Sequence, residues 1–193
     1  MLQEWDDGWW RHAARVPSPN FNARPADARV DTVVLHSISL PPGQYGGDAI
    51  ERLFTNTLDW TAHPYFETIR GLQVSAHFLV RRDGAVLQFV PIDQRAWHAG
   101  RSSWGDRAQA NDWSIGIELE GLEGELFEPA QYDALEKLLR AVDHVRAIRH
   151  VVGHEHVAPG RKADPGPGFD WAALAARLRW DAGRIPAATP RGD

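Results

Sequence analysis

The sequence contains no cysteine. Disulfide bonds, thiolate zinc sites, iron–sulfur clusters and a cysteine nucleophile are therefore all excluded. If a zinc ion is bound, its protein ligands must be histidine and aspartate or glutamate side chains. Any metal chemistry of this chain thus depends on imidazoles and carboxylates.

Long hydrophobic runs are also missing. No stretch approaches the roughly 18 consecutive apolar residues typical of a transmembrane helix. The first residues, MLQEWDDGWWRH, are acidic and aromatic, whereas a secretory signal begins with positive charge and continues with an apolar region. We therefore expect a cytoplasmic protein with no membrane partner.

Positive charge is not in excess. The formal net charge is -5 at pH 7, and no basic stripe is interleaved with aromatic residues, so we expect no nucleic-acid partner. The nucleotide-binding motifs GxGxxG and GxxxxGK[ST] are absent as well. With 193 residues, 43% of them hydrophobic, the chain is expected to form one domain with a substantial core, and we expect a monomer.

The order of apolar segments predicts an α/β (α+β) domain with a mixed central β-sheet flanked by helices, rather than a regular βαβ array. Asp83-Gly84 is typical of a hairpin turn. We expect strands at 31–37, 75–81, 85–90, 114–119 and 151–152, helices at 48–55, 129–148 and 170–180, and irregular chain at 56–73 and 95–113. The domain is expected to comprise residues 1–181, with 1–30 as an extended wrapping segment, followed by a disordered tail at 182–193.

Ionisable side chains accompany three of the apolar segments. His36 follows TVVL, Glu118 follows SIGI, and His154 follows VVG and precedes Lys162 and Asp164. Such groups are costly to bury without a partner, so three in one short chain suggest that the strand ends converge on one site. Two imidazoles and a carboxylate there could hold a metal ion. No short zinc signature such as HExxH is present, so spacing alone does not identify the ligands.

Five segments carry a resemblance to a known family. They are VVLHSISLPPGQYGG, VSAHFLVRRDGAVLQFVP, RAWHAG, NDWSIGIELEG and VVGHEHVAPGRKADPGPGFDW. In this order they closely resemble the N-acetylmuramoyl-L-alanine amidase type 2 family, and within it the AmpD-like branch of 1,6-anhydro-N-acetylmuramyl-L-alanine amidases of cell-wall recycling. The resemblance extends over about residues 16–171. It implies a mixed sheet flanked by helices, a fold shared with peptidoglycan-recognition proteins.

The resemblance also implies a role for individual residues. His36, His154 and Asp164 are the expected zinc (Zn2+) ligands, with one coordination position left open. Glu118 falls on the family's catalytic carboxylate, which takes a proton from water. Lys162 falls on the cation beside the metal, where the oxyanion develops. The implied reaction is hydrolysis of the lactyl–L-alanine amide bond of a small anhydro-muramyl tri- or tetrapeptide.

Two neighbouring residues compete for these roles. Glu120 lies two residues after Glu118 and would share its strand face. His156 lies two residues after His154 and could be a ligand in place of Asp164. We prefer Glu118 and Asp164 because they fall on the family's motif positions.

The expected substrate-binding residues are Ser37, His77, Trp97, His98 and Asn111. Ser37 stands where many AmpD-type enzymes carry asparagine, and a hydroxyl has one donor hydrogen where an amide has two. His77 and His98 could line the pocket, or they could orient a metal ligand through a hydrogen bond. Trp97 could stack on the substrate or belong to the core, and Asn111 could contact the substrate or fix its loop.

Two further functions are compatible with these motifs. A related amidase acting on intact peptidoglycan, as an autolysin or endolysin, would use the same residues. A non-catalytic peptidoglycan-binding module would show substitutions at the ligand triad or at Glu118. Because all of these positions carry competent residue types, we favour the anhydro-muropeptide amidase.

Overall fold

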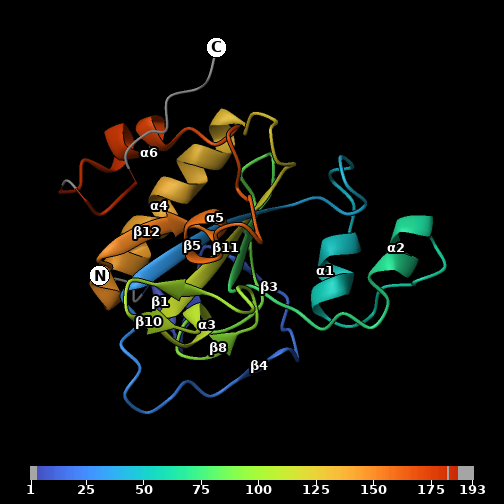
Figure 1. Cartoon of the computed structure of the whole chain (residues 1–193), viewed down its shortest axis with the longest axis horizontal. Helices are drawn as coiled ribbons and strands as arrows, with labels where there is room; N and C mark the ends of the chain where they lie inside the picture. Colours follow the sequence, from blue (N-terminus) through green and yellow to red (C-terminus); the bar gives the residue numbers. More distant parts are fainter. Residues whose placement is uncertain (1–3, 182, 187–193) are drawn as a thin grey trace.

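The computed structural model describes residues 4–181 and 183–186. Its main element is a six-stranded sheet in which β12, β5, β11 and β6 run parallel and β7 is antiparallel to β6 (β12, β5 and β11 are labelled in Figure 1). In sheet order the strands are β12 (His150–Gly153), β5 (Thr32–Ile38), β11 (Ser114–Glu120), β6 (Phe78–Val80), β7 (Val86–Gln88) and β3 (Ala14–Arg15). The predicted mixed sheet is confirmed.

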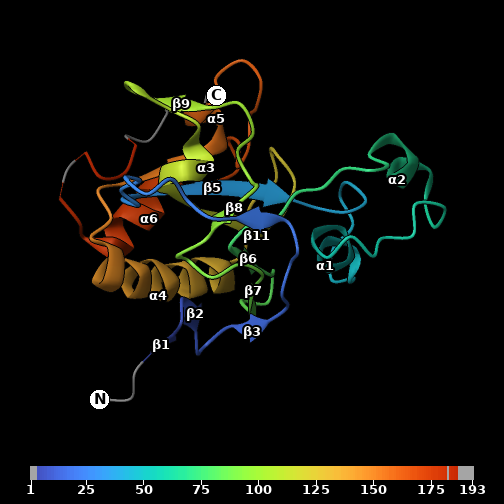
Figure 2. The same ribbon diagram turned by 90° about the horizontal axis from the view of Figure 1, so that it is seen from below.

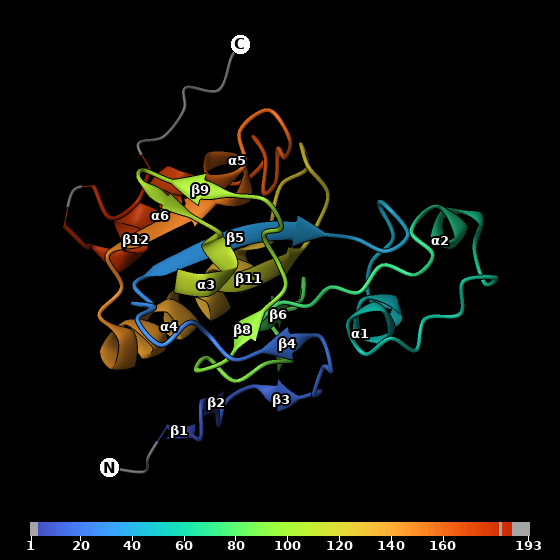
Figure 3. The same ribbon diagram turned by 60° about the horizontal axis from the view of Figure 1, so that its bottom comes forward.

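Helices lie on both faces of this sheet and beside it. The described helices are α1 (Ala49–Phe54), α2 (Pro64–Thr68), α3 (Ala110–Trp113), α4 (Pro129–Arg146), α5 (His154–Val157) and α6 (Trp171–Leu178). Figure 2 shows α4 along one face of the sheet and α3 with α5 on the other. In Figure 3, α1 and α2 lie together beyond the carboxyl end of β5.

Alternation along β5 decides which face each side chain reaches. Val33 and Leu35 belong to the large core cluster that includes the apolar side chains of α4 and α6. Val34 packs on the opposite face with Trp113 of α3 and Val157 of α5. His36, two residues after Val34, therefore leaves the sheet on the side of α3 and α5.

Helix α4 begins where the sequence indicates. Pro129 occupies the first turn, and the Gln131 side chain accepts a hydrogen bond from the backbone N–H of Glu128 at 3.0 Å, so the helix start is capped. Its apolar side chains are buried, with Leu138 and Leu139 fully covered. They pack on the face of the sheet opposite His36.

The two segments predicted to be irregular contain short elements. Residues 56–73 include α2, where His63 Nδ1 accepts a hydrogen bond from the Tyr65 N–H at 3.1 Å and Pro64 follows as the first helical residue. The loop 95–113 includes α3 and three short strands, β8 (Arg95–Ala96), β9 (Ser103–Trp104) and β10 (Arg107–Ala108). Elements of two to five residues have no measurable periodicity, so the sequence pattern does not reveal them.

The amino-terminal segment contributes β3 to the sheet edge and otherwise forms three short strands, β1 (Trp5–Asp6), β2 (Trp9–Trp10) and β4 (Phe21–Asn22). Most of the predicted tail, residues 182 and 187–193, lies outside the described residues. Within 183–186, the Arg184 carbonyl accepts a hydrogen bond from the Val151 N–H at 2.7 Å. None of the described helices has the length and apolarity that a membrane span requires.

Candidate metal centre and its cavity

Three adjacent parallel strands bring the predicted polar residues to one edge of the sheet. His36 of β5 and Glu118 of β11 are register partners. Gly153 of β12 pairs with Leu35, and His154 follows as the first residue of α5. Because the carboxyl ends of parallel strands open on one side of a sheet, this edge is where such folds place their ligands.

His36, His154 and Asp164 form a close triangle of donor atoms. His36 Nδ1 lies 3.0 Å from His154 Nδ1 and 3.2 Å from Asp164 Oδ2, and His154 Nδ1 lies 3.0 Å from the same oxygen. The three residues are 2%, 3% and 5% exposed. Asp164 comes from the loop after α5, and its carbonyl accepts a hydrogen bond from the Glu155 N–H at 2.9 Å, so the loop is anchored beside His154.

This triangle fits a divalent metal ion. A tetrahedral zinc ion with bonds of about 2.0–2.1 Å holds its ligand atoms roughly 3.3 Å apart, close to the separations of 3.0–3.2 Å found here. Among the described residues, it is the only group of three or more potential ligands found within such reach. The site can therefore bind a metal through two imidazoles and one carboxylate.

The protonation states suit that role. Burial lowers the pKa of His36 to about 4, against the opposing hydrogen bond to Asp164. Burial works to raise the pKa of Asp164, but its hydrogen bonds with His154 and His36 outweigh this effect and hold the pKa well below its usual range. At neutral pH His36 is neutral and Asp164 is ionised, which are the forms that ligate metals.

Glu118 and Glu120 have different surroundings. Glu120 is 2% exposed and bound on both oxygens: Oε1 lies 3.1 Å from Arg81 Nη1 and accepts from the Gly46 N–H, while Oε2 accepts from the Arg82 N–H. Glu118 is 8% exposed, and its buried Oε2 has no hydrogen-bond partner among the described residues. Burial, reinforced by the negative charge of Asp164, raises the pKa of Glu118 well above its usual value. Of the two carboxyls, Glu118 is therefore the one available for proton transfer.

A cavity of about 460 Å³ opens beside the triangle. Its polar side includes Glu118, Ser37 and the exposed Lys162 together with the three donor residues. Its apolar side comes from the region of α1 and α2 and includes Leu53, Phe54, Tyr65, Ile69 and Leu72. This apolar wall was not predicted from the sequence, where the only signal for it is the recurrence of Tyr65, Ile69 and Leu72 within a segment predicted to be irregular.

The predicted substrate-binding residues separate into two groups. Ser37 and His98 line the cavity, so substrate contact stays a prediction for both. His77, Trp97 and Asn111 are not among its lining residues. His77 is fully buried and its Nδ1 accepts from the Gly116 N–H at 3.0 Å. Trp97 is half-buried and its indole N–H donates to Asn22 Oδ1 at 2.7 Å, while Asn111 bonds to the backbone of the segment 98–99.

His156, the alternative ligand, does not join the triangle. Its Nδ1 accepts a hydrogen bond from the Gly153 N–H at 2.8 Å. The strand ends at Gly153 and α5 begins at His154, so the two histidines do not share a strand face as an extended chain would require.

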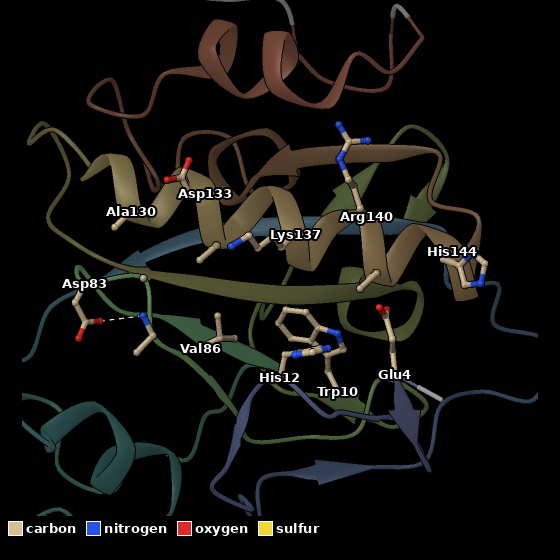
Figure 4. A pocket seen from close by; sticks show the side chains of 14 residues that line it. Glu4, Trp10, His12, Asp83, Val86, Ala130, Asp133, Lys137, Arg140 and His144 are labelled. Carbon is tan, nitrogen blue, oxygen red and sulfur yellow. Dashed lines mark hydrogen bonds between the residues drawn. The ribbon is translucent and has the colours of Figure 1, made fainter. Parts of the chain in front are cut away.

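A second cavity, of about 800 Å³, lies on the opposite side of the molecule between α4 and the β6–β7 hairpin with the amino-terminal strands (Figure 4). Lys137, Arg140 and His144 line it from α4, and Trp10 and His12 line it from the amino-terminal segment. It contains none of the metal-ligand triangle, so the chemistry belongs to the smaller cavity.

Comparison with known proteins agrees with this site. Residues 26–167 match the family described as N-acetylmuramoyl-L-alanine amidase. The chain is 51% identical over 173 residues to the 1,6-anhydro-N-acetylmuramyl-L-alanine amidase AmpD of Citrobacter freundii, an alignment that covers 89% of this chain and 92% of that protein. It also resembles a crystal structure of a selenomethionine derivative of AmpD, with a TM-score of 0.88 and 50% identity. This likeness covers 92% of this chain and 99% of that one.

A third similar structure carries a ligand. It is the amidase AmiD of E. coli in complex with the substrate anhydro-N-acetylmuramic acid-L-Ala-D-γ-Glu-L-Lys. The likeness has a TM-score of 0.58 at 31% identity and covers 81% of this chain and 60% of that one.

Proposed function

Because the chain belongs to the N-acetylmuramoyl-L-alanine amidase family, we propose that it hydrolyses the amide bond between the lactyl group of 1,6-anhydro-N-acetylmuramic acid and L-alanine. This reaction separates the sugar from the stem peptide of small muropeptides during peptidoglycan recycling. The observation that carries the proposal is the buried triangle of His36, His154 and Asp164 beside the unpartnered carboxyl of Glu118.

The cofactor that fits this site is a zinc ion, which would be held by His36, His154 and the Asp164 carboxylate. When bound, zinc supplies Lewis acidity that polarises the scissile carbonyl and lowers the pKa of water to roughly 7. The nitrogen and oxygen donors suit zinc, and three protein ligands are the number typical of a catalytic site.

Glu118 is the general base and then the general acid. Its register pairing with His36 places it at the same edge of the sheet, and its raised pKa brings it nearer to the operating pH than an ordinary carboxyl. Such a group can take a proton from the attacking water and return it to the departing alanine nitrogen, which contributes about 10²–10⁴-fold to the rate.

Lys162 stabilises the negative charge that develops on the carbonyl oxygen. It is exposed, lines the cavity and lies two residues before Asp164. A positive charge directed at a developing oxyanion contributes on the order of 3 kcal/mol to transition-state stabilisation.

The substrate is a small anhydro-muramyl tri- or tetrapeptide, and the enzyme acts on it as a cytoplasmic monomer. Support for this choice comes from the relatives: AmpD is named for the 1,6-anhydro sugar, and AmiD was solved with an anhydro-muramyl tripeptide. The cavity of about 460 Å³ is within the range of sites for single small molecules.

The test is product analysis by mass spectrometry. The zinc-loaded chain is incubated with synthetic anhydro-muramyl tripeptide and, in parallel, with intact sacculi. We expect free tripeptide and 1,6-anhydro-N-acetylmuramic acid from the first substrate, loss of this activity with a chelator, and recovery with zinc. Faster release from sacculi would reassign the enzyme to intact peptidoglycan, and no release from either would indicate a binding module.

A further inference from the structure

With a metal ion in the triangle, both histidines must carry their proton on the same ring nitrogen. His36 and His154 present Nδ1 to each other and to Asp164. A neutral imidazole ligates through its unprotonated nitrogen, so each ring must be the Nε2–H tautomer. The partner of each Nε2 atom then determines whether that tautomer is favoured.

For His154 the partner is a backbone carbonyl. His154 Nε2 lies 3.1 Å from the Ala99 oxygen. A carbonyl can only accept a hydrogen bond, so the proton of His154 is held on Nε2. Arg161 Nη2 donates to the same carbonyl at 2.7 Å, which fixes the position of the oxygen.

For His36 the partner is another imidazole, and a chain of hydrogen bonds sets its direction. His36 Nε2 lies 2.9 Å from His98 Nδ1, and His98 Nε2 lies 3.3 Å from Ser114 Oγ. The Ser114 hydroxyl donates to the Ala110 carbonyl at 2.5 Å, which leaves its oxygen free to accept from His98. His98 is therefore protonated on Nε2, its Nδ1 accepts, and His36 donates from Nε2.

The two partners, the His98 ring and the Ala99 carbonyl, are neighbours in the chain, and one side chain holds them both. Asn111 Oδ1 accepts from the His98 N–H at 3.1 Å and from the Ala99 N–H at 2.8 Å. Asn111 is 6% exposed and belongs to α3, which runs directly into β11. The backbone that supports both ligands is thus tied to the strand that carries Glu118.

We propose that Asn111 is a positioning residue that holds the segment His98–Ala99 against the Nε2 atoms of His36 and His154 and so directs both Nδ1 atoms at the metal position. This proposal rests on the proposed metal centre. It assigns to Asn111 an effect on metal binding without contact with the metal or the substrate, since Asn111 does not line the cavity.

The first measurement reads the Nε2–H hydrogen bonds directly. ¹H–¹⁵N NMR of the zinc-loaded chain at about pH 8, where a free imidazole is neutral, detects the Nε2–H proton of each ring. In the unaltered chain we expect both protons to exchange slowly with water, because His154 donates to the Ala99 carbonyl and His36 donates to His98. Asn111→Leu removes the shared acceptor at nearly the same volume and should speed the exchange of both protons, whereas Asn111→Asp keeps an acceptor oxygen and should keep the exchange slow.

The second measurement is zinc affinity by chelator competition. We expect Asn111→Leu to weaken zinc binding about 10- to 100-fold, the range found for groups that orient metal ligands, and Asn111→Asp to retain most of the affinity. The matched control is Asn20→Leu. Asn20 is also buried and donates to the Val74 carbonyl at 2.8 Å, but it has no hydrogen bond to the segment 98–99. Asn20→Leu should leave Nε2–H exchange and zinc affinity unchanged.

Ser114→Ala separates the hydrogen bond of His36 from that of His154. It removes the acceptor of His98 and should speed Nε2–H exchange at His36 while leaving that of His154, which depends on Ala99. If Asn111→Leu does not fold, Ser114→Ala and Asn111→Asp still decide the question. Unchanged exchange in Asn111→Leu, or at His36 of Ser114→Ala, would overturn the proposal. Absence of zinc binding by the unaltered chain would overturn the metal centre instead.

Discussion

Glu118 of β11 and His36 of β5 are register partners in adjacent parallel strands, and their side chains leave the sheet on the same face. Parallel strands lie about 4.8 Å apart, so this pairing places a carboxyl beside the imidazole of the triangle. The distance between the two groups is therefore fixed by the backbone ladder and by the core behind it. Any change that shifts the register of β11 would separate the proposed base from the proposed metal.

Removal of Glu118 is expected to abolish turnover without loss of metal. In Glu118→Ala we predict a decrease in kcat of at least about 10²-fold, because the general base is lost, with full zinc content by elemental analysis. The matched variant is Glu120→Gln, which changes the neighbouring buried carboxyl. It should keep most of its activity but unfold at lower denaturant concentration, because it weakens the pairing with Arg81. Loss of zinc in Glu118→Ala would instead indicate that Glu118 is a metal ligand.

A methyl group at Gly116 is expected to disturb the metal site. A Cβ atom at this position would lie 2.4 Å from His98 Cγ, so Gly116→Ala must push His98 away from His36. We predict destabilisation of about 1–3 kcal/mol in urea unfolding, typical of overpacking, together with weaker zinc binding. The control is Gly47→Ala, where nothing lies within 4 Å of the added atom. Equal unfolding free energies and zinc affinities in the two variants would refute the steric argument.

The stability of the metal-free chain is expected to fall at acidic pH, in part through His77. Burial and the nearby charge of Arg24 lower the pKa of His77 well below its usual value, so the folded form stays neutral while the unfolded form binds a proton below about pH 6.5. The contribution of His77 is thus fully present above that pH and decreases as the pH falls. Below about pH 6.5, this contribution to the free energy of unfolding decreases by about 1.4 kcal/mol per pH unit.

His77→Gln tests this contribution. The variant should be less stable at neutral pH, because the hydrogen bond from Gly116 to the ring is lost, but its stability should depend less steeply on pH. Urea unfolding between about pH 5 and 6.5, in the presence of a chelator, measures both slopes. Parallel slopes for the two proteins would show that His77 is protonated in the folded state.

The apolar wall of the cavity is expected to contribute to substrate binding through Leu72. This side chain is 43% exposed and lines the cavity. Leu72→Ser should raise KM about three- to tenfold through lost apolar contact and leave kcat and thermal stability nearly unchanged. Leu126, 65% exposed and not among the lining residues, provides the control: Leu126→Ser should leave KM unaltered. A higher KM in both variants would point to a general effect.

Much of the sheet and of the triangle could be predicted from the sequence. The strands β5 and β11 and the helix α4 have strong periodicity and extend over seven, seven and eighteen residues, so their apolar faces are visible in the pattern. The motif resemblance then named the three donor residues that the structure brings within 3.0–3.2 Å. Convergence of strand ends explains why residues so far apart in the chain meet.

The roles of the supporting residues could not be predicted. Asn111 and His77 fall in motifs that could serve the substrate, but their hydrogen bonds go to backbone groups. The choice between Glu118 and Glu120 likewise depends on Arg81, which pairs with Glu120 across the sheet. Such assignments depend on which side chain meets which partner in three dimensions, and a linear pattern does not contain that information.

The order in which the donor residues are made has a consequence for biosynthesis. The contact between His36 and Asp164 spans 128 positions of the chain, and β5 completes its ladder only after β11 and β12 have been translated. A ribosome-bound fragment that ends before Asp164 therefore has no complete chelating set. Metal binding is therefore expected to follow the folding of the segment from β5 to Asp164 and not to precede it.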